Sequence, residues 1–318
     1  MTLSVPAVYG HVPFVLVDVP AGCLQCSPLV PGSIALGDIT PASCAEFIVH
    51  APASTVERRY VIALALRALM PGAPLVVLAA NDKGGTRLAS ELTAFGCVIS
   101  ADHKRHHRII TTTRPETIIG LDDAIAAGLP RLLPDLGLWS QPGLFNWDRI
   151  DPGTQLLLDH LAVLKGRGAD LGCGFGVLSR AVLAHGECMH LTLIDIDQRA
   201  LAMAARNVPS ERVTLLWAEV RTAKALPTSL DFVVMNPPFH DGGAEDRALG
   251  ATFIEKAAAM LRPGGVLWMT ANRHLPYEAT LTPLFQTVDQ IAQAKGFKIY
   301  SAHKATAAVK VPRPRVRK

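Results

Sequence analysis

Residues 231–240 read Asp-Phe-Val-Val-Met-Asn-Pro-Pro-Phe-His, an apolar run that ends in a polar turn. The apolar part predicts a buried strand over 231–235. The two prolines fix φ and remove two N–H donors, so the turn is stiff. The amide oxygen of Asn236 and the carbonyl of Pro237 can each accept a hydrogen from one planar NH2 group, and Phe239 can stack on the ring that carries it. We expect these three residues to be catalytic, with an ordinary strand exit as the alternative.

A glycine-rich segment lies upstream at residues 169–178, Ala-Asp-Leu-Gly-Cys-Gly-Phe-Gly-Val-Leu. Its glycines let backbone N–H groups approach a ligand closely at the start of a helix that we predict to run to about residue 184. The Gly-x-Gly-x-x-Gly spacing of nicotinamide enzymes fails, because Val177 stands where its last glycine would be. The cofactor-binding residues expected in this loop are Asp170, Gly172, Gly174 and Gly176.

Two more acids follow β-rich runs. A strand predicted at 190–195 ends in Asp195, 19 positions beyond the last glycine of the loop, where a carboxylate can accept both ribose hydroxyls of a nucleoside. A second strand, at 213–217, leads to Glu219. Asp197 is better placed to cap a helix at 198–207. The remaining cofactor-binding residues that we expect are Asp195, Ile196, Glu219, Val220 and Asn236.

The Asp-x-Gly-x-Gly-x-Gly form of the loop resembles the first motif of class I S-adenosylmethionine-dependent methyltransferases. That resemblance implies that Asp170 contacts the methionine end of the cofactor and that Glu219 lies near the adenine amine. Three further segments are similar to the ribosomal RNA guanine-N2 methyltransferases of the small-subunit methyltransferase C type. These segments are residues 142–158, residues 236–242, and residues 271–278 together with 298–300. Members of that family pair an inactive N-terminal methyltransferase-like domain with an active C-terminal one.

The resemblance implies transfer of a methyl group from S-adenosyl-L-methionine to the exocyclic N2 amine of a guanine in ribosomal RNA, foremost the 16S rRNA. The expected partner is ribosomal RNA within a subunit or an assembly intermediate. His240 and Asp241 are candidates for taking up the released proton, or are ordinary loop residues.

Other acceptors remain open. The segment Ala-Asn-Arg-His at 271–274 also resembles enzymes that modify 23S rRNA. Asn-Pro-Pro-[Tyr/Phe] turns also serve protein-glutamine N5 methylation and adenine N6 methylation in DNA. The duplicated N-terminal half and the basic tail favour RNA over protein glutamine, and no DNA-recognition segment is evident, so DNA is not expected. A non-catalytic ribosome-assembly factor would not need Asp170, Asp195 and Asn236 together.

The N-terminal half repeats features of the C-terminal half. The matching segments are 47–54 with 232–239, 69–81 with 261–272, and 108–110 with 298–300. We therefore predict an α/β chain of two tandem Rossmann-like methyltransferase units, of which the N-terminal one is degenerate. In it Ala51 replaces Asn236, the glycine loop is absent, and Asp18 is the match for Asp195. The alternative is two unrelated α/β units that share ordinary Pro-Gly turns before their strands.

The predicted domains are an RNA-binding or scaffold domain at 1–125, a connection at 126–141, the catalytic domain at 142–304 and a basic tail at 305–318. Basic side chains in the first and last of these suit RNA phosphates, although solvated surface charge would look the same. The RNA-binding residues that we expect are Lys104, Arg105, Arg108, Arg313, Arg315 and Arg317.

The composition of the 318 residues, with a net charge of +4, fits a globular chain long enough for two domains. Residues 1–20 lack the pattern of a signal peptide, and the most apolar region, 61–80, contains an arginine and two prolines. We expect no membrane span and a cytoplasmic location. The six cysteines do not form a disulfide pattern, and Cys23-x-x-Cys26 lacks a second pair, so we expect reduced thiols and no metal, with zinc or redox chemistry as the alternative.

Overall fold

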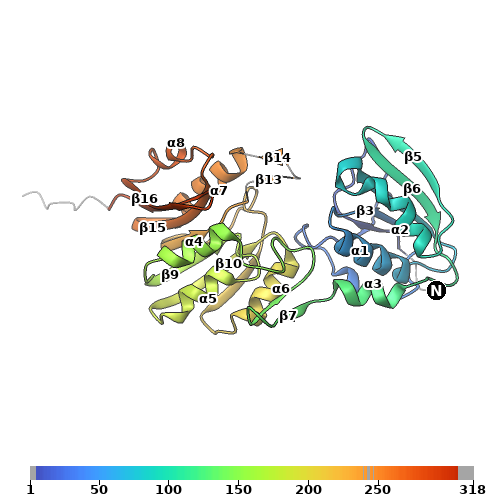
Figure 1. Cartoon of the computed structure of the whole chain (residues 1–318), viewed down its shortest axis with the longest axis horizontal. Coiled ribbons are helices and arrows are strands. Elements are labelled where there is room, and N and C mark those ends of the chain that lie inside the picture. The colour runs from blue at the N-terminus through green and yellow to red at the C-terminus, as the bar shows by residue number, and fades with distance from the viewer. Residues whose placement is uncertain (1–4, 239, 242–243, 246, 307–318) are drawn as a thin grey trace, which may run out of the picture. The chain divides into compact units, whose positions relative to one another are not determined.

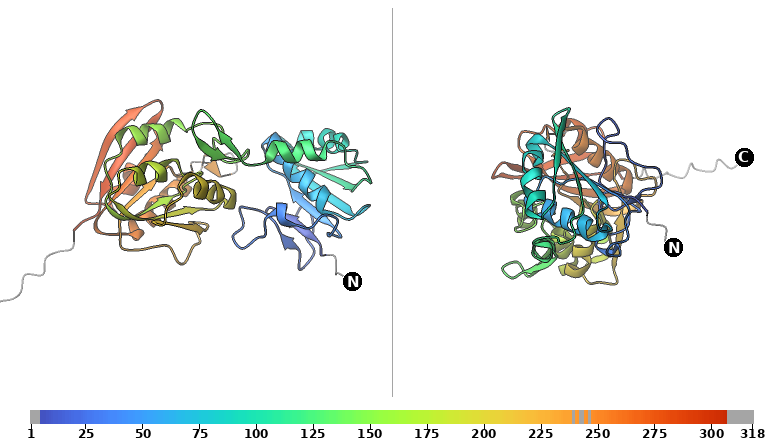
Figure 2. Two further views of the ribbon diagram at one scale, coloured as in Figure 1. Left: turned by 90° about the horizontal axis from the view of Figure 1, so that it is seen from below. Right: turned by 90° about the vertical axis from the view of Figure 1, so that its right-hand side faces the viewer.

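The computed structural model describes residues 5–238, 240–241, 244–245 and 247–306. Contacts divide the chain into two compact units. Unit 1 comprises Met1–Arg149 and Ile196–Met203, and unit 2 comprises Ile150–Asp195 and Ala204–Lys318. Each unit contains its own large sheet with helices packed against it (Figures 1 and 2). The prediction of two tandem α/β units is therefore confirmed.

Unit 2 is built on a seven-stranded sheet in the order β11-β10-β9-β12-β15-β17-β16. The first five of these strands are parallel, whereas β17 runs antiparallel to both of its neighbours. The strands are β9 (Gly166–Leu171), β10 (Cys188–Asp195), β11 (Val213–Trp217), β12 (Leu230–Met235), β15 (Leu261–Asn272), β16 (Thr287–Ala294) and β17 (Phe297–His303). The strands predicted at 190–195, 213–217 and 231–235 correspond to β10, β11 and β12.

The helices of unit 2 include the connections between its parallel strands. They are α4 (Pro152–His160), α5 (Val177–Ala184), α7 (Arg247–Met260) and α8 (Glu278–Leu281), together with the end of α6 (Gln198–Asn207), whose residues 198–203 are grouped with unit 1. Two short strands, β13 (His240–Asp241) and β14 (Ala244–Glu245), pair after β12. The strand order reverses between β9 and β12, which are neighbours although β10 and β11 lie between them in the sequence. Ligands of doubly wound sheets bind at such a switch point, outside the carboxyl ends of the strands.

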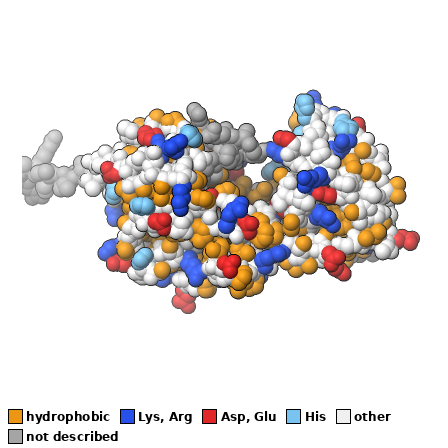
Figure 3. Space-filling model, viewed as in Figure 1, with side chains coloured by type: hydrophobic (Ala, Val, Ile, Leu, Met, Phe, Trp, Pro, Cys, Tyr) orange, Lys and Arg blue, Asp and Glu red, His pale blue; other side chains and the backbone are white. Residues whose placement is uncertain are grey.

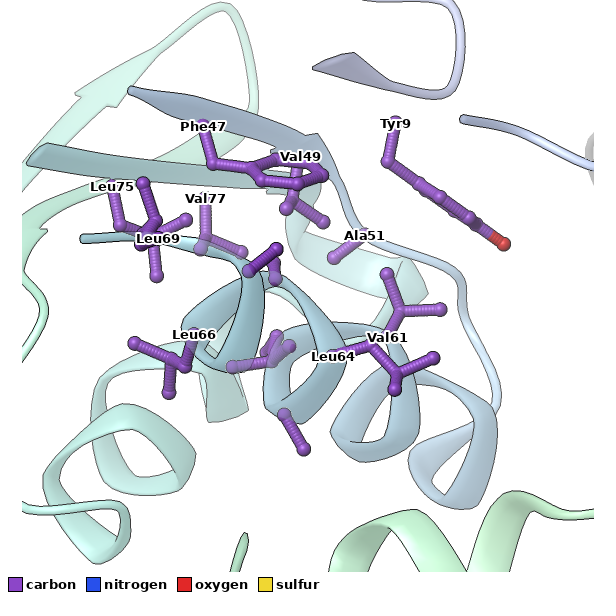
Figure 4. Close-up of a cluster of buried hydrophobic side chains, with 14 of the residues drawn as sticks. Tyr9, Phe47, Val49, Ala51, Val61, Leu64, Leu66, Leu69, Leu75 and Val77 are labelled. Atoms are coloured by element: carbon purple, nitrogen blue, oxygen red, sulfur yellow. The ribbon is translucent and has the colours of Figure 1, made fainter. Parts of the chain in front are cut away.

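Unit 1 contains a six-stranded sheet in the order β2-β1-β3-β4-β6-β5, in which β6 is antiparallel to β4 and β5. The strands are β1 (Ala7–Tyr9), β2 (Leu24–Gln25), β3 (Phe47–His50), β4 (Pro74–Ala80), β5 (Ser100–Lys104) and β6 (His107–Thr113). The helices are α1 (Thr55–Ala68), α2 (Leu88–Ala94) and α3 (Leu121–Gly128). Figure 4 shows side chains of β3 and β4, such as Phe47 and Val77, facing apolar side chains of α1 such as Val61 and Leu66.

The two sheets repeat one another in their C-terminal halves. The order β3-β4-β6-β5 corresponds to β12-β15-β17-β16, with the same parallel pair followed by the same antiparallel pair. This agrees with the internal sequence match. The proposed match of Asp18 with Asp195 is wrong, however. Asp195 ends β10, whereas Asp18 lies in an exposed loop before β2, the strand that corresponds to β10, so it cannot stand at the end of that strand.

Residues 126–141, which we expected to connect the domains, include the end of α3 and a hairpin of β7 (Arg131–Leu133) and β8 (Leu138–Ser140). The side chain of Gln141 donates to the carbonyl of Gly128 over 2.9 Å, which ties the hairpin to the end of α3. Among the described residues, no helix is both long and apolar enough to cross a membrane.

Candidate active site

The loop that follows β9 contains three glycines in the left-handed region of backbone conformation. Gly172, Gly174 and Gly176 have φ values of +78°, +53° and +89°. At Gly176 an added Cβ would lie 3.1 Å from Val208 and 3.2 Å from Ala204, so the glycine lets α5 approach α6 closely. At Gly174 no heavy atom lies within 4 Å of an added Cβ. The loop thus presents its backbone to open space at Gly174 and to the protein core at Gly176.

Asp170 lies at the base of this loop and is fully buried. Its Oδ2 accepts a 2.6 Å hydrogen bond from Ser179 Oγ on α5. Its Oδ1 is buried without a hydrogen-bond partner among the described residues. Burial raises the pKa of Asp170 to about 7, the Ser179 hydrogen bond opposes the rise, and the nearby Asp195 carboxylate adds to it. A buried carboxylate oxygen without a donor is a place where a ligand cation can bind.

Asp195 ends β10, beside the glycine loop. Its Oδ2 accepts a 2.8 Å hydrogen bond from the backbone N–H of Gly174, so the acid and the loop are held together. Ile196 follows it directly and is partly buried. Asp197 accepts a 2.9 Å hydrogen bond from the backbone N–H of Arg199, which is the helix-capping role that we predicted for it.

Glu219 and Val220 follow β11, the edge strand next to β10. Glu219 accepts hydrogen bonds of 3.0 Å from the backbone N–H and 2.9 Å from the guanidinium of Arg221. Partial burial works against ionisation of Glu219, but the hydrogen bonds and charge of Arg221 prevail and lower its pKa. Val220 is buried in the hydrophobic cluster that also contains residues of β9 and β12. An ionised, partly exposed acid therefore stands at the end of the third parallel strand.

Asn236 follows β12 directly, at the same edge of the sheet. Its amide nitrogen donates to Thr154 Oγ1 over 2.8 Å and to Asp151 Oδ2 over 3.1 Å. Both acceptors lie at the start of α4. Because the two N–H groups of the amide point toward α4, the amide oxygen is the part of Asn236 that can accept from a ligand. Pro237 is buried and Pro238 is exposed, while Phe239 lies outside the described residues.

The structure therefore brings the predicted residues of β9, β10, β11 and β12 to one edge of the sheet. Sequence reasoning did not find Asp151 and Thr154 as members of the site. The local signal for Asp151 is present, since an aspartate before Pro152 is a typical N-cap, and its carboxylate does accept from the backbone N–H groups of Gly153 and Thr154. Their approach to Asn236, 85 and 82 positions away, depends on the fold and not on a motif.

The described residues of this edge fit S-adenosylmethionine. The buried Asp170 Oδ1 lacks a donor that a ligand ammonium would supply. The loop leaves open space at Gly174, where a side chain would otherwise stand. Carboxylates follow both β10 and β11, where hydroxyl and amine donors of a nucleoside would be accepted. No cluster of metal-binding side chains occurs in the part of the chain that the structure describes.

Unit 1 has a different arrangement after β3, the strand that corresponds to β12. The guanidinium of Arg58 donates to the carbonyls of Ala53 over 2.7 Å and of Pro52 over 3.2 Å. It also forms two 2.7 Å hydrogen bonds with the buried carboxylate of Glu91. The carbonyl of Pro52, which corresponds to that of Pro237, thus accepts from the planar guanidinium of Arg58. In unit 1 a group of the protein therefore occupies the space next to the carbonyl that corresponds to that of Pro237.

The basic segment of unit 1 forms the end of the hairpin β5–β6. Lys104 and Arg105 are exposed and Arg108 is partly exposed. Arg105 and His106 form the two-residue turn, with φ values of +46° and +61°. In Figure 3 histidine and cationic side chains gather at the end of unit 1 where Figure 1 labels β5. Arg313, Arg315 and Arg317 lie outside the described residues.

Comparisons with known proteins agree with this geometry. The family model of the methyltransferase small domain matches residues 135–301. The ribosomal RNA small subunit methyltransferase C of Shewanella loihica is 33% identical over 81% of this chain and 77% of its own length. That of Shewanella pealeana is 31% identical over 80% of this chain and 76% of its own length.

A solved structure shares the fold of the whole chain. It is the T. thermophilus 16S rRNA N2 G1207 methyltransferase in complex with AdoMet and guanosine. The match has a TM-score of 0.74 with 21% sequence identity, and it covers 96% of this chain and 89% of that one. Because it extends over both units, the two-unit architecture is common to the two proteins.

Proposed function

Because the chain belongs to the ribosomal RNA small subunit methyltransferase C family, we propose that it methylates the exocyclic N2 amine of a guanine in 16S rRNA. The guanine that we infer corresponds to G1207, the nucleotide named for the T. thermophilus protein that shares the fold. The observation that carries the proposal is the orientation of Asn236. Its amide oxygen is turned away from α4 and is available to accept from an amine at the carboxyl edge of the sheet.

The protein's own contribution to the reaction is to bind and orient. Bound S-adenosylmethionine supplies an electrophilic methyl group on a sulfonium, so little acid–base chemistry is required of the site. The lone pair of guanine N2 is delocalised into the ring and is a weak nucleophile. Hydrogen bonds from N2 to Asn236 Oδ1 and to the Pro237 carbonyl favour a more tetrahedral nitrogen and stabilise the positive charge that develops on it. Holding amine and methyl group in line supplies much of the remaining acceleration.

The cofactor-binding roles follow from the order of the strands. We infer that Asp170 receives the ammonium of the methionine part, that the backbone at Gly172 and Gly174 lies against it, and that Asp195 receives the ribose hydroxyls. Glu219 and Val220 then border the adenine, with Ile196 beside the ribose. The support is the unpaired Oδ1 of Asp170, the open space at Gly174 and the ionised state of Glu219.

We infer that unit 1 binds the ribosomal RNA backbone through the end of the β5–β6 hairpin. A two-residue hairpin turn with positive φ at both positions favours Asn-Gly, whereas this chain has Arg105-His106. Side chains with a Cβ cost of the order of 1–2 kcal/mol each in the left-handed region. The presence of an arginine and a histidine at these strained positions, with Lys104 and Arg108 beside them, supports a binding role. The basic tail with Arg313, Arg315 and Arg317 is proposed to add to it.

The physiological partner in this proposal is ribosomal RNA within a small subunit or an assembly intermediate, and the place of action is the cytoplasm, where ribosomes assemble. Two separate units, one of them with an internally filled acceptor position, suit an RNA that offers both a target base and neighbouring phosphates. A target guanine has to leave its stack to reach Asn236, and we expect Phe239 to hold the base in that position.

Labelled-methyl transfer from S-adenosylmethionine tests the proposal. Unmodified 16S and 23S rRNA are each supplied naked and assembled, and the product is digested to nucleosides. N2-methylguanosine in the 16S material is the expected result. N2-methylguanosine in the 23S material would assign the protein to a large-subunit activity instead. Absence of label from every RNA, in protein that still binds S-adenosylmethionine, would contradict an RNA substrate and make protein glutamine the next acceptor to test.

A further inference from the structure

Asn236 can serve as an acceptor only if its amide is held one way round. A side-chain amide presents an oxygen on one side and an NH2 group on the other, and a rotation of 180° exchanges them at little cost in shape. A flipped Asn236 would present N–H donors to the donor amine of the substrate. Some feature of the protein has to select the productive orientation.

Two side chains at the start of α4 select the productive orientation of the Asn236 amide. Asp151 Oδ2 and Thr154 Oγ1 both lie within hydrogen-bond distance of the Asn236 amide nitrogen, at 3.1 Å and 2.8 Å. A carboxylate oxygen accepts hydrogen bonds, so it rejects the flipped orientation, which would bring two oxygens together. Thr154 is 8% exposed, so its hydroxyl has little access to water as a competing partner.

The Asp151 side chain and the start of α4, which carries Thr154, are themselves fixed. Asp151 Oδ2 also accepts from the backbone N–H groups of Gly153 at 2.9 Å and Thr154 at 3.0 Å, as the N-cap of α4. At Gly153 an added Cβ would lie 2.7 Å from the ring of Phe297, the first residue of β17. This close approach packs the start of α4 against the sheet that carries Asn236. The orientation of the amide therefore depends on rigid elements and not on a loop.

We propose that Asp151 and Thr154 are positioning residues for the acceptor amine, which they influence by holding the Asn236 amide oxygen toward it. The carboxylate also polarises the amide, which increases the negative charge on Asn236 Oδ1. That charge faces N2 while N2 bonds to the methyl carbon, the C–S bond of the sulfonium breaks to leave a neutral thioether, and one N2 proton passes to water. The inference deepens the proposed function and rests on it for the identity of the acceptor.

Four variants test the proposal on the full chain. Asp151→Asn keeps an N-capping oxygen but removes the charge, and Thr154→Val keeps the shape but removes the hydroxyl. We expect each to lower kcat about 10-fold or more, with the Kd for S-adenosylmethionine and the KM for rRNA changed less than about twofold. Thr154→Ser restores the hydroxyl and is expected to restore kcat. Asp159→Asn makes the same chemical change on α4, at a carboxylate that contacts Gln155, and is expected to have no effect.

A second readout does not depend on activity. In protein labelled with 15N at asparagine, the side-chain NH2 signals of Asn236 report its hydrogen bonds. We expect these signals to shift in Asp151→Asn and Thr154→Val but not in Asp159→Asn. The positioning role would be overturned if the signals of Asn236 or the kcat stayed unchanged in these two variants. It would also be overturned if losses of Tm and of cofactor binding accounted for the fall in kcat. Wild-type protein that methylates no RNA would overturn the proposed function alone, since the amide signals would still test the anchor.

Discussion

Arg58 on α1 and Glu91 on α2 form a buried ion pair in unit 1, with two hydrogen bonds of 2.7 Å between guanidinium and carboxylate. Arg58 is fully buried and the side chain of Glu91 is 8% exposed. The same guanidinium donates hydrogen bonds to the carbonyls of Pro52 and Ala53 after β3. The guanidinium therefore connects α1 and α2 to the segment that follows β3.

Removing one partner of this pair leaves a buried charge without compensation. We expect Arg58→Met to lower the free energy of unfolding of unit 1 by about 3–5 kcal/mol. Arg59→Met is the matched control on the same helix, because Arg59 is exposed and only approaches the ring of Phe95, with 5.7 Å to its centroid. Its expected effect is below about 1 kcal/mol. Urea unfolding of the full chain measures both, and similar midpoints for the two variants would contradict a structural role for the pair.

The buried carboxyl of Asp170 predicts a conflict between stability and cofactor binding. Its pKa is about 7 in the folded protein and near the ordinary value of 3.8 in the unfolded chain. The folded state therefore binds more protons between these values, and the stability associated with protonated Asp170 is lost as the pH rises through about 7. Asp170→Asn mimics the protonated form. We expect it to raise the free energy of unfolding of the ligand-free protein by about 1–3 kcal/mol at pH 8, and by much less at pH 5.

Asp170→Asn should also fail to bind S-adenosylmethionine. Thermal unfolding with and without S-adenosylmethionine gives both results in one experiment. Wild-type protein should gain Tm when the ligand is added, whereas Asp170→Asn should start higher at pH 8 and gain nothing. A lower Tm than wild type at pH 8 would mean that the Ser179 hydrogen bond, and not burial, dominates the energetics of Asp170.

Gly174 of the glycine loop allows an effect on ligand binding to be measured separately from an effect on stability. Gly174→Ala places a methyl group in the open space of the loop, and Gly186→Ala does the same at an exposed turn with φ +74° and no atom within 4 Å. Both should cost about 1–2 kcal/mol of stability, because a Cβ is disfavoured at positive φ. Calorimetric titration should show that only Gly174→Ala weakens S-adenosylmethionine binding, by about 10-fold or more. Equal affinities for the two variants would remove Gly174 from the cofactor site.

Gly176→Ala should behave differently from Gly174→Ala. Its methyl group would lie 3.1–3.2 Å from Val208 and Ala204 of unit 2, in addition to the positive φ of +89°. The contact is tight and the neighbours are backbone and branched side-chain atoms. We expect a stability loss larger than that of Gly174→Ala by about 1–3 kcal/mol, the usual cost of overpacking. A Tm equal to that of Gly174→Ala would show that α5 and α6 separate readily.

Asn236 itself allows a direct test of the acceptor role. Asn236→Ala removes the amide oxygen at the edge of the sheet, and methyl transfer to rRNA should fall at least about 100-fold, as when one preorganised hydrogen-bond partner of a transition state is removed. The Kd for S-adenosylmethionine should change little, since Asp170, Gly174 and Asp195 remain. Filter-bound label and calorimetry measure the two quantities. A loss of affinity that matches the loss of turnover would move Asn236 from the acceptor to the cofactor.

The sequence allowed individual strands, helices and the glycine loop to be predicted because hydrophobic period, glycine spacing and the positions of prolines are local signals. The helix at 198–207 and the strand at 213–217 coincide with α6 and β11 for that reason. The match of Asp18 with Asp195 failed because the strand that corresponds to β10 is the two-residue β2, which comes after Asp18 and is too short to give a sequence signal. Asp151 and Thr154 could not be assigned, since their contact with Asn236 exists only once α4 is packed on the sheet.

The turn of the β5–β6 hairpin predicts that RNA binding and stability oppose one another in unit 1. Replacing Arg105-His106 by Asn-Gly gives the turn its preferred residues, so we expect the free energy of unfolding to rise by about 1–2 kcal/mol. The loss of one cation should raise the KM for rRNA and reduce the slope of log K against log salt by about 1. Ala42→Gly is the control, because Ala42 is exposed in unit 1 with φ +53° and carries no charge. It should stabilise the protein and leave the KM unchanged. If the Asn-Gly variant also keeps its KM and salt slope, the hairpin does not contact RNA and the positive φ values need another explanation.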